Sequence, residues 1–304
     1  MHPAPSVIVF TVLSGLGFGT MTLLGLGFGP SGAVAGPFTG LFALALAGAG
    51  LLASTLHLGN AQRAWRAFSQ WRTSWLSREG VVSVALMAVF FAYVAGWFLT
   101  GAPSRPLGLL SALLAALAVF STAMIYAQLK TVPRWSNPFT VAMFLGLALA
   151  GGVIANGLAM AMAGETAGPG AGLPLLIGSA AAYAYRRRTG ALTLGTAATP
   201  ESATGLGALG KVRQVEPPHS APNYLMKEMI FVVGRRRAEK LAVLFVIFGL
   251  FAPLFLYILS RDAGALAAPG LALALLLHLF GAFVSRWLFF AEAEHVVGLY
   301  YGRR

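Results

Sequence analysis

Long apolar runs, each followed by a short polar break, dominate the sequence. The hydrocarbon core of a bilayer is about 30 Å thick, and a helix needs roughly 20 apolar residues to cross it. Runs of that kind occupy residues 6–30, 34–58, 80–100, 106–129, 138–162, 171–186, 240–260 and 267–291. The sixth run is the weakest, because it is short and ends at three consecutive arginines. The sequence therefore predicts an all-α integral membrane protein with eight transmembrane helices.

The composition excludes most water-soluble folds. Hydrophobic residues make up 58% of the 304 residues and charged residues 10%, whereas a soluble domain has about 25% charged residues. Nine acidic side chains cannot cover the surface of a soluble protein of this length. The absence of cysteine excludes disulfides, thiolate zinc sites and iron–sulfur clusters held by this chain. No basic stretch precedes the first apolar run, so we expect a retained helix there rather than a cleaved signal peptide.

The positive charges are distributed unevenly between the predicted loops. With eight helices, both termini lie on one side, together with the loops after helices 2, 4 and 6. These segments hold 18 of the 21 lysines and arginines, and the opposite side holds only Arg105 and Arg261. Cytoplasmic loops are enriched in lysine and arginine, so we expect both termini in the cytoplasm and the protein in the inner membrane. The net charge of +12 then indicates orientation, and we expect no nucleic-acid partner.

The longest predicted connection, residues 187–239, lies between helices 6 and 7 on the cytoplasmic side. Its first half is rich in glycine, alanine and threonine, as flexible linkers are. Residues 223–233 in its second half have apolar side chains at helical spacing and are suited to lie along a membrane surface. Because the first half has no core of its own, we interpret residues 1–304 as a single membrane domain.

The segment after the second apolar run combines a boundary histidine with a tryptophan-rich stretch. His57 falls where the second helix meets the cytoplasm, so its imidazole can exchange protons with water. Wound as an α-helix, residues 61–76 form an amphipathic helix suited to the membrane interface. Its apolar face holds Ala61, Ala64, Trp65, Phe68 and Trp75, and its polar face holds Arg63, Arg66, Gln70 and Thr73. Arg72 breaks this pattern, because it projects among the aromatic rings. Membrane anchoring explains the segment as a whole, and for His57 and Arg72 we favour a functional role.

Few other polar residues fall at membrane depth. His278 lies near the middle of the last run, and Arg286 lies deeper than its cytoplasmic boundary. A b-type haem needs two axial ligands at the same depth, but His57 and His278 differ by about 15 Å at a rise of 1.5 Å per residue. His295 matches the depth of His57 better but falls at the very end of the span. We therefore expect no haem.

Glycine is frequent in the first run, where Gly15 and Gly19 are four residues apart. A nucleotide-binding loop needs a strand before it, which the sequence does not predict here. Small residues at this spacing let two transmembrane helices approach closely. We interpret them as a helix-packing surface.

A resemblance to a known family rests on six segments: residues 2–8, 56–65, 71–79, 129–138, 223–228 and 286–292. Together they resemble the membrane anchor subunits of DMSO reductase-type molybdoenzyme complexes, and the resemblance covers essentially the whole chain. The sequence His-Leu-Gly at 57–59 belongs to the wider family. The tryptophan-rich stretch, Val-Pro-Arg-Trp at 132–135 and Asn-Tyr-Leu-Met-Lys-Glu at 223–228 resemble the branch of the sulfite–quinone oxidoreductases (sulfite dehydrogenases).

This resemblance implies an eight-helix anchor without haem that binds quinone, either ubiquinone or menaquinone, close to its partners. The partners would be an iron–sulfur electron-transfer subunit and, beyond it, a molybdopterin catalytic subunit. The anchor would then supply only the quinone site and would not act on the substrate itself. The residues expected at the quinone are His57, Arg72, Arg78, Ser54 and Trp71. The residues expected to dock the partners are Arg63, Arg66, Lys130, Arg134, Trp135, Tyr224 and Lys227.

The charge distribution favours the sulfite branch, because it puts the side that carries His57 in the cytoplasm. The catalytic subunits of DMSO and polysulfide reductases, by what the resemblance implies, generally face outward. Three alternatives stay open: an anchor that oxidises quinol for an S-oxide or polysulfide reductase, a purely structural anchor, and a stand-alone transporter. The sequence does not determine the substrate, because another polypeptide would bind it.

Overall fold

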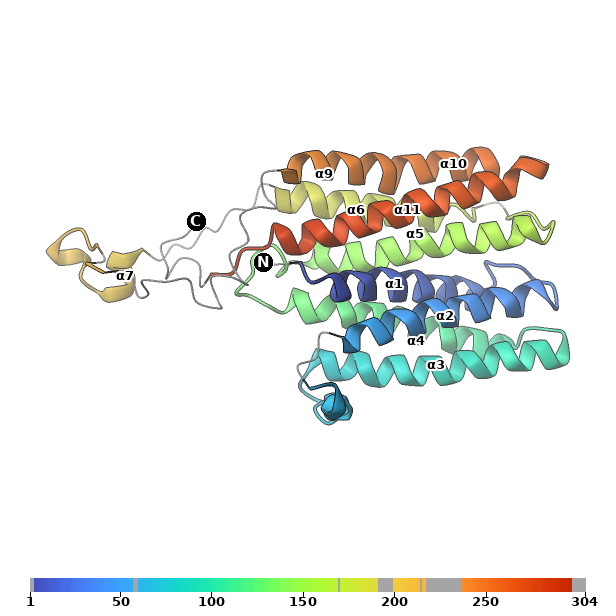
Figure 1. Ribbon diagram of the computed structural model, residues 1–304, viewed down its shortest axis with the longest axis horizontal. Coiled ribbons are helices and arrows are strands. Elements are labelled where there is room, and N and C mark those ends of the chain that lie inside the picture. The colour runs from blue at the N-terminus through green and yellow to red at the C-terminus, as the bar shows by residue number, and fades with distance from the viewer. Residues whose placement is uncertain are drawn as a thin grey trace.

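The computed structural model describes residues 3–56, 60–168, 170–190, 199–213, 215–216 and 237–296, and every regular element in these ranges is a helix (Figure 1). This confirms the prediction of an all-α fold. The long helices are α1 (Pro5–Leu26), α2 (Ala35–Thr55), α3 (Trp75–Thr100), α4 (Arg105–Ala127), α5 (Pro138–Met162), α6 (Leu173–Gly190), α9 with α10 (Ala238–Leu244 and Ala252–Ser260) and α11 (Ala267–Ala291). A π-helical stretch, Phe245–Phe251, joins α9 and α10 into one rod.

Seven of these rods are long and apolar enough to cross a membrane. The exception is α6, which has only 18 residues and carries Arg187 and Arg188 in its last turn. The sequence also gives the sixth apolar run as the least certain membrane span, because it is short and ends in arginines. The described residues therefore give seven membrane-spanning helices by length and composition, and the eighth span stays a prediction.

Glycine and proline set several of the helix ends. Gly27 and Gly101 end α1 and α3 with φ of 88° and 74°, in the left-handed region that other residues rarely adopt. Proline stands in the first turn of α1, α4 and α5, where its missing N–H costs no hydrogen bond. These breaks explain why the apolar runs of the sequence match the helices closely.

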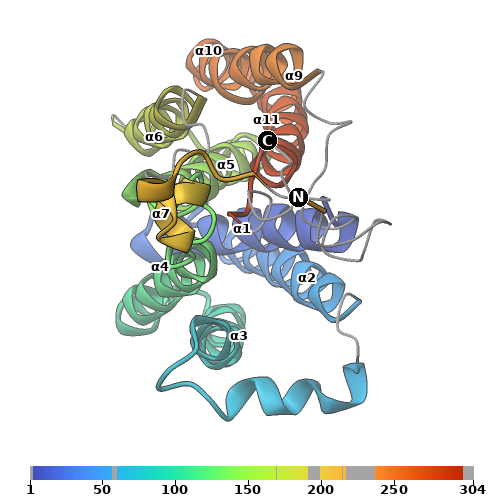
Figure 2. The same cartoon turned by 90° about the vertical axis from the view of Figure 1, so that its left-hand side faces the viewer.

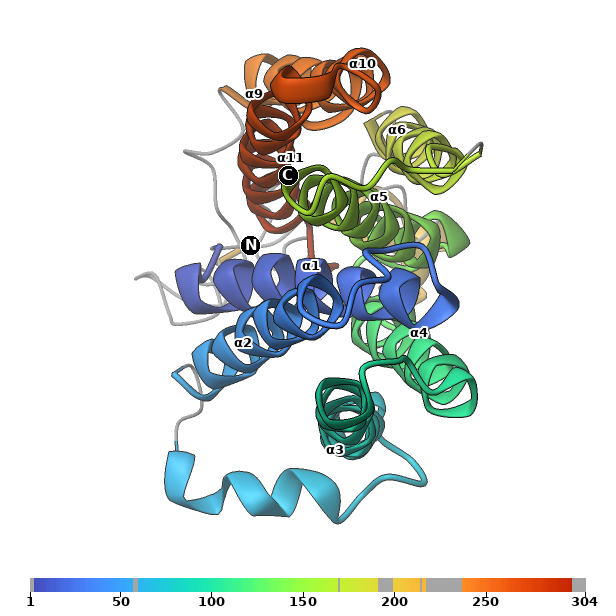
Figure 3. The ribbon, with the colours of Figure 1, turned by 90° about the vertical axis from the view of Figure 1, so that its right-hand side faces the viewer.

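The helices form two groups of four that meet along α1 and α5 (Figures 2 and 3). In the first group, α1 packs against α2 and α4, and α3 packs against α4. In the second group, α5 packs against α6 and α11, and the α9–α10 rod packs against α11. The two groups thus have the same arrangement, with α1 and α5, α2 and α6, α4 and α11, and α3 and the α9–α10 rod in matching places. No repeat in the sequence reveals this arrangement.

The contact between α1 and α5 depends on small side chains. A Cβ atom added at Gly19 would overlap the backbone of Ala148, and one added at Gly152 would overlap Gly19. The backbones of the two helices therefore touch, as the packing interpretation predicted for Gly19. Gly15 differs, because an added Cβ there meets no atom within 4 Å.

Both ends of the described chain lie at one end of the bundle, which we call the terminal end (Figure 1). The loop 128–137 between α4 and α5 and the segment 60–74 between α2 and α3 lie at this end as well. The connections 27–34, 101–104, 163–168 and 261–266 lie at the other end, which we call the opposite end. The short helix α7 (Pro200–Thr204) lies beyond the terminal end.

The segment 60–74 differs from the predicted α-helix over residues 61–76. Ala61–Phe68 form a 3₁₀ helix, turns follow, and Ser74 is extended with φ −106° and ψ 126° before α3 begins at Trp75. In a 3₁₀ helix, residues three apart share a face, which puts Trp65 and Phe68 together. Trp75 belongs to α3 instead, so the predicted continuous aromatic face does not form.

Candidate functional site

The described part of the predicted quinone site lies at the terminal end. Ser54 stands in the last turn of α2, Trp71 and Arg72 lie in the turns before α3, and Arg78 lies in the first turn of α3. His57, Tyr224 and Lys227 lie outside the described residues. The fold therefore brings the described members to one end of the bundle, because all of them lie in or beside the connection between α2 and α3.

Arg78 fixes the turn that precedes α3. Its Nε donates to the carbonyl of Trp71 over 3.0 Å and its Nη2 to the carbonyl of Arg72 over 2.6 Å. Its guanidinium also lies 4.3 Å from the ring centroid of Trp75. These contacts use two of its donors and one face of its guanidinium inside the chain. Arg78 is thus a positioning residue for Trp71 and Arg72.

Arg72 and Trp71 are exposed at the surface of the terminal end. The guanidinium of Arg72 lies 5.6 Å from the ring centroid of Trp71, rather than among the rings of Trp65, Phe68 and Trp75 as predicted. Trp71 is 54% exposed and Trp65 is 65% exposed. Tryptophan is enriched where a membrane meets water, so this surface is suited to lie at the membrane boundary.

Ser54 makes a local contact only. Its hydroxyl donates to the carbonyl of Leu51 over 2.6 Å, within the last turn of α2. A hydroxyl bonded in this way keeps its lone pairs as acceptors.

A buried carboxyl group, which the sequence interpretation missed, lies directly beneath this surface. Glu79 follows Arg78 in α3 and is 5% exposed, and the hydroxyl of Thr122 in α4 donates a hydrogen bond to it. Within the described part of the chain, no ion pair reaches Glu79. A carboxyl group in such a place can accept and release a proton. One signal was available in the sequence: Glu79 is the only acidic residue between Met1 and Thr100.

The predicted docking residues of the loop 128–137 make different contacts. Lys130 is exposed, as are Arg63 and Arg66 in the 3₁₀ helix. Arg134 is half-buried, and its Nη1 lies 3.1 Å from Oε2 of Glu292, which Arg186 also contacts. This group of three charges joins the loop 128–137, α6 and the end of α11.

Trp135 is buried within the chain, and its role in partner docking stays a prediction. It is 3% exposed, and its Nε1 donates to the carbonyl of Phe289 over 2.8 Å. Its ring stacks on that of Phe289, with centroids 5.2 Å apart. Tyr126 and Phe144 pack around the same rings. Trp135 therefore holds the loop to α11, because its apolar ring is more stable in the core than in water.

The described histidines do not form a pair. His278 lies inside α11, and His295 lies four residues beyond the end of that helix. Partial burial lowers the pKa of His295 below its usual value. No group of three metal-ligating side chains occurs within the ranges that the structure covers.

The sequence matches known proteins over its whole length. The family model of the DMSO reductase anchor subunit (DmsC) matches residues 1–302. A sulfite dehydrogenase subunit of Allochromatium vinosum is 35% identical, and the match covers 99% of both chains. The anaerobic dimethyl sulfoxide reductase chain YnfH of Escherichia coli is 32% identical, with 49% of this chain and 55% of its own covered.

No solved structure matches the chain. The family match spans almost every residue, and the helices long enough to cross a membrane agree with an anchor. The chain is a multi-pass membrane anchor subunit and belongs to the DMSO reductase anchor subunit (DmsC) family.

Proposed function

We propose that this chain is the membrane anchor and quinone-binding subunit of a complex that passes electrons from sulfite to quinone. We choose sulfite as the substrate because the match to the sulfite dehydrogenase subunit is the longer of the two matches. The sulfite dehydrogenase subunit is covered over 99% of both chains, whereas the match to the dimethyl sulfoxide reductase chain covers about half of each.

The redox metals of such a complex would belong to its partners. The chain has no cysteine and so no thiolate for an iron–sulfur cluster. We therefore assign the clusters to an iron–sulfur subunit docked at the terminal end and the oxidation of sulfite to a molybdopterin subunit beyond it. The exposed cations Arg63, Arg66 and Lys130 are suited to bind an acidic surface of the first of these partners. We also propose that Tyr224 and Lys227 contact this partner.

The proposed quinone site comprises residues 54–79. The main structural support for it is the buried carboxyl group of Glu79. Reduction of a quinone takes two electrons, here from the clusters of the partner, and two protons. A carboxyl group near the terminal surface, with Thr122 as its only described hydrogen-bond donor, can hold one of these protons. We assign His57 to a quinone carbonyl and Arg72 to the negative charge that develops on the ring.

The proposed orientation has eight spans, with α6 as the sixth and both termini in the cytoplasm. Its support is that the terminal end carries most of the arginines, including those of α6 and of the segment 60–78. The partners would then work on the cytoplasmic side of the inner membrane. Reporter fusions at residue 304 and within the connection 101–104 should give cytoplasmic and outward signals, respectively. The reverse pattern would contradict this orientation.

The decisive experiment measures sulfite-dependent reduction of a soluble quinone analogue by the complex purified through this chain. His57→Ala should lower that rate strongly, while sulfite oxidation with an artificial acceptor stays unchanged, because only the quinone site is altered. Gln62→Ala is the matched control, since Gln62 is exposed on the same segment. Equal quinone reduction in His57→Ala and in the parent complex would remove His57 from the site.

The second candidate function is the reverse reaction, in which the anchor oxidises quinol for an S-oxide or polysulfide reductase. The match to the dimethyl sulfoxide reductase chain supports it. The same purified complex distinguishes the two. Quinol-dependent reduction of dimethyl sulfoxide or polysulfide without any sulfite-dependent activity would favour the second candidate.

A further inference from the structure

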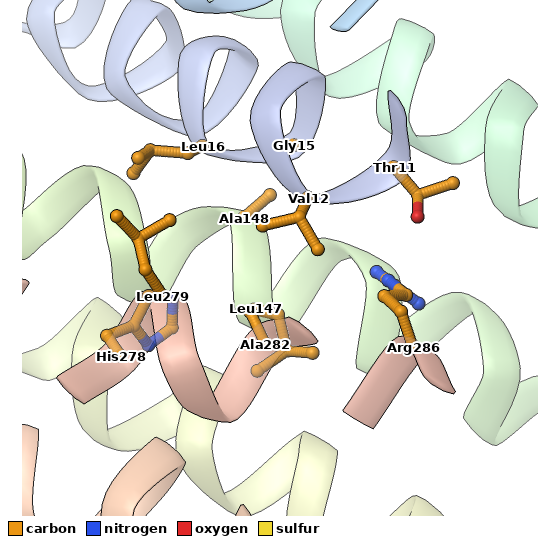
Figure 4. A pocket seen from close by; sticks show the side chains of 10 residues that line it. All are labelled: Thr11, Val12, Gly15, Leu16, Leu147, Ala148, His278, Leu279, Ala282 and Arg286. Atoms are coloured by element: carbon orange, nitrogen blue, oxygen red, sulfur yellow. The ribbon is translucent and has the colours of Figure 1, made fainter. Parts of the chain in front are cut away.

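A small cavity lies inside the bundle, apart from the segment 54–79. Its walls come from residues 11–16 of α1, 147–148 of α5 and 278–286 of α11 (Figure 4). Its volume of about 20 Å³ exceeds the roughly 10–15 Å³ that a cavity needs to hold one water molecule. The cavity is therefore too small for an organic ligand, but it has room for water.

Two ionisable side chains of α11 face this cavity from its two ends. His278 and Arg286 are each 3% exposed, and Figure 4 shows them at two separate places along α11, with Ala282 between them. Nδ1 of His278 and Nη1 of Arg286 have no hydrogen-bond partner among the described residues. The two residues are eight positions apart, which is about 12 Å along a helix. A buried polar atom without a partner costs about 1–3 kcal/mol, so water in the cavity would stabilise both groups.

Arg286 is the only permanent charge that faces the cavity. Its guanidinium lies 3.5 Å from the ring centroid of Phe144, and no ion pair reaches it within the described part of the chain. The cavity walls from α1 and α5 contribute no titratable side chain. A guanidinium stays protonated in proteins, and its charge repels a hydronium ion. We therefore expect protons to move slowly through this cavity, and not at the rate of an open channel.

Two glycines shape the space around His278. A Cβ added at Gly151 in α5 would come 2.9 Å from Nε2 of His278, so only glycine leaves room for the imidazole there. Gly15 of α1 lines the cavity, and an added Cβ would meet no atom within 4 Å. A larger side chain at residue 15 would therefore extend into the cavity.

A second buried polar group of α5 lies nearer the opposite end. Asn156 of α5 is 1% exposed, and its Nδ2 donates to the carbonyls of Thr20 and Gly152 over 3.2 and 2.9 Å. Its Oδ1 has no partner in the described ranges. Asn156 is five residues beyond Gly151, about 7.5 Å further along α5. A larger cavity of about 220 Å³ lies near this level, at the opposite end. Residues 23–29 of α1 and the loop after it, residues 153–160 of α5, Tyr257, and Ala167, Gly168 and Ala171 line it.

We propose that α1, α5 and α11 enclose a hydrated proton-transfer path, with Arg286 toward the terminal end, His278 in the middle and Asn156 toward the opposite end. A proton from water forms an N–H bond at one imidazole nitrogen of His278, and the N–H bond at the other nitrogen breaks to release a proton to water. Nothing is oxidised or reduced in this step. The path is separate from the quinone site and does not depend on it.

Vesicles test the path directly. The full chain, with any subunits that purify with it, is reconstituted into phospholipid vesicles that contain a pH-sensitive dye, and a potassium gradient with valinomycin drives protons inward. The parent chain should acidify the vesicles faster than protein-free vesicles do. His278→Phe and Gly15→Leu should each remove this excess rate, the first by deleting the proton carrier and the second by filling the cavity.

Gly96→Leu is the matched control for Gly15→Leu. Gly96 lies in α3, away from the cavity, and a Cβ added there also meets no atom within 4 Å. Vesicles with Gly96→Leu should therefore acidify at the same rate as vesicles with the parent chain. His278→Gln replaces His278→Phe if the latter does not fold, as judged by gel filtration and thermal unfolding. The proposal is overturned if the parent rate equals that of protein-free vesicles. It is also overturned if either the His278 variant or Gly15→Leu keeps the parent rate.

Discussion

The indole of Trp135 donates its N–H to the carbonyl of Phe289 over 2.8 Å, and its ring stacks on the ring of the same residue. This pair joins the loop between α4 and α5 to the end of α11. The contact therefore joins the two groups of helices at the terminal end, because the loop follows α4 of the first group and α11 belongs to the second.

Trp135→Phe tests this contact. Phenylalanine keeps much of the ring packing but leaves the buried carbonyl of Phe289 without its donor, which should cost about 1–3 kcal/mol. We expect a lower midpoint of thermal unfolding in detergent, followed by circular dichroism. Trp71→Phe should leave that midpoint unchanged, because Trp71 is largely exposed. Equal midpoints for Trp135→Phe and the parent would show that the hydrogen bond contributes little.

Glu292→Gln should destabilise the same end by removing the negative charge shared by Arg134 and Arg186. Both arginine side chains are less than one fifth exposed, so their charges would lose a partner in a place that water reaches poorly. We expect a loss of about 1–3 kcal/mol in the free energy of unfolding, larger at low salt than at high salt. Glu239→Gln, an exposed acid at the start of α9, is the control. A loss of the same size in Glu239→Gln would assign the effect to net charge.

Glu79→Gln separates the proton-holding role of this residue from its place in the fold. Glutamine has the same shape and still accepts the hydrogen bond of Thr122, so the protein should fold normally. Quinone reduction should fall about 10²-fold or more, as expected when a group that transfers a proton is lost. Sulfite oxidation with an artificial acceptor should persist. A variant that folds and reduces quinone at the parent rate would exclude Glu79 from proton transfer.

Gly19→Ala should lower the stability of the protein, whereas Gly15→Ala should not. A methyl group at Gly19 would overlap the backbone of Ala148 and force α1 and α5 apart, whereas one at Gly15 meets no atom within 4 Å. Alanine in the middle of a helix is otherwise favoured over glycine by about 0.5–1 kcal/mol. Thermal unfolding should therefore show a lower midpoint for Gly19→Ala and an equal or higher one for Gly15→Ala. Two lower midpoints would mean that the space at Gly15 is not open.

The short-range features of this protein follow from its sequence. The apolar runs predict the long helices, because the length of each run and the glycines and prolines around it act locally. The missing cysteines and the position of the arginines also need no structure to be interpreted. The six segments that resemble the anchor family are a property of the sequence too, and the family match confirms the resemblance.

Other features depend on residues that are far apart in the chain, and only the tertiary structure decided them. The burial of Trp135 against Phe289 and the pairing of Glu79 with Thr122 each join two helices or a helix and a loop. The stretch 61–76 has an α-helical pattern, yet the structure forms a 3₁₀ helix at Ala61–Phe68 and turns after it, and Trp75 belongs to α3, which packs against α4.

Gly15 and Gly19 show the difference most clearly. They have the same residue type and lie one turn apart on α1, so the sequence gives both the same role. The structure places Gly19 against the backbone of α5 and Gly15 beside a cavity that His278 and Arg286 face. The sequence by itself determined that α1 is a helix with small residues on its surface. Only the packing of α1 against α5 and α11 decided which of them closes a contact and which leaves space, because that depends on where neighbouring helices run.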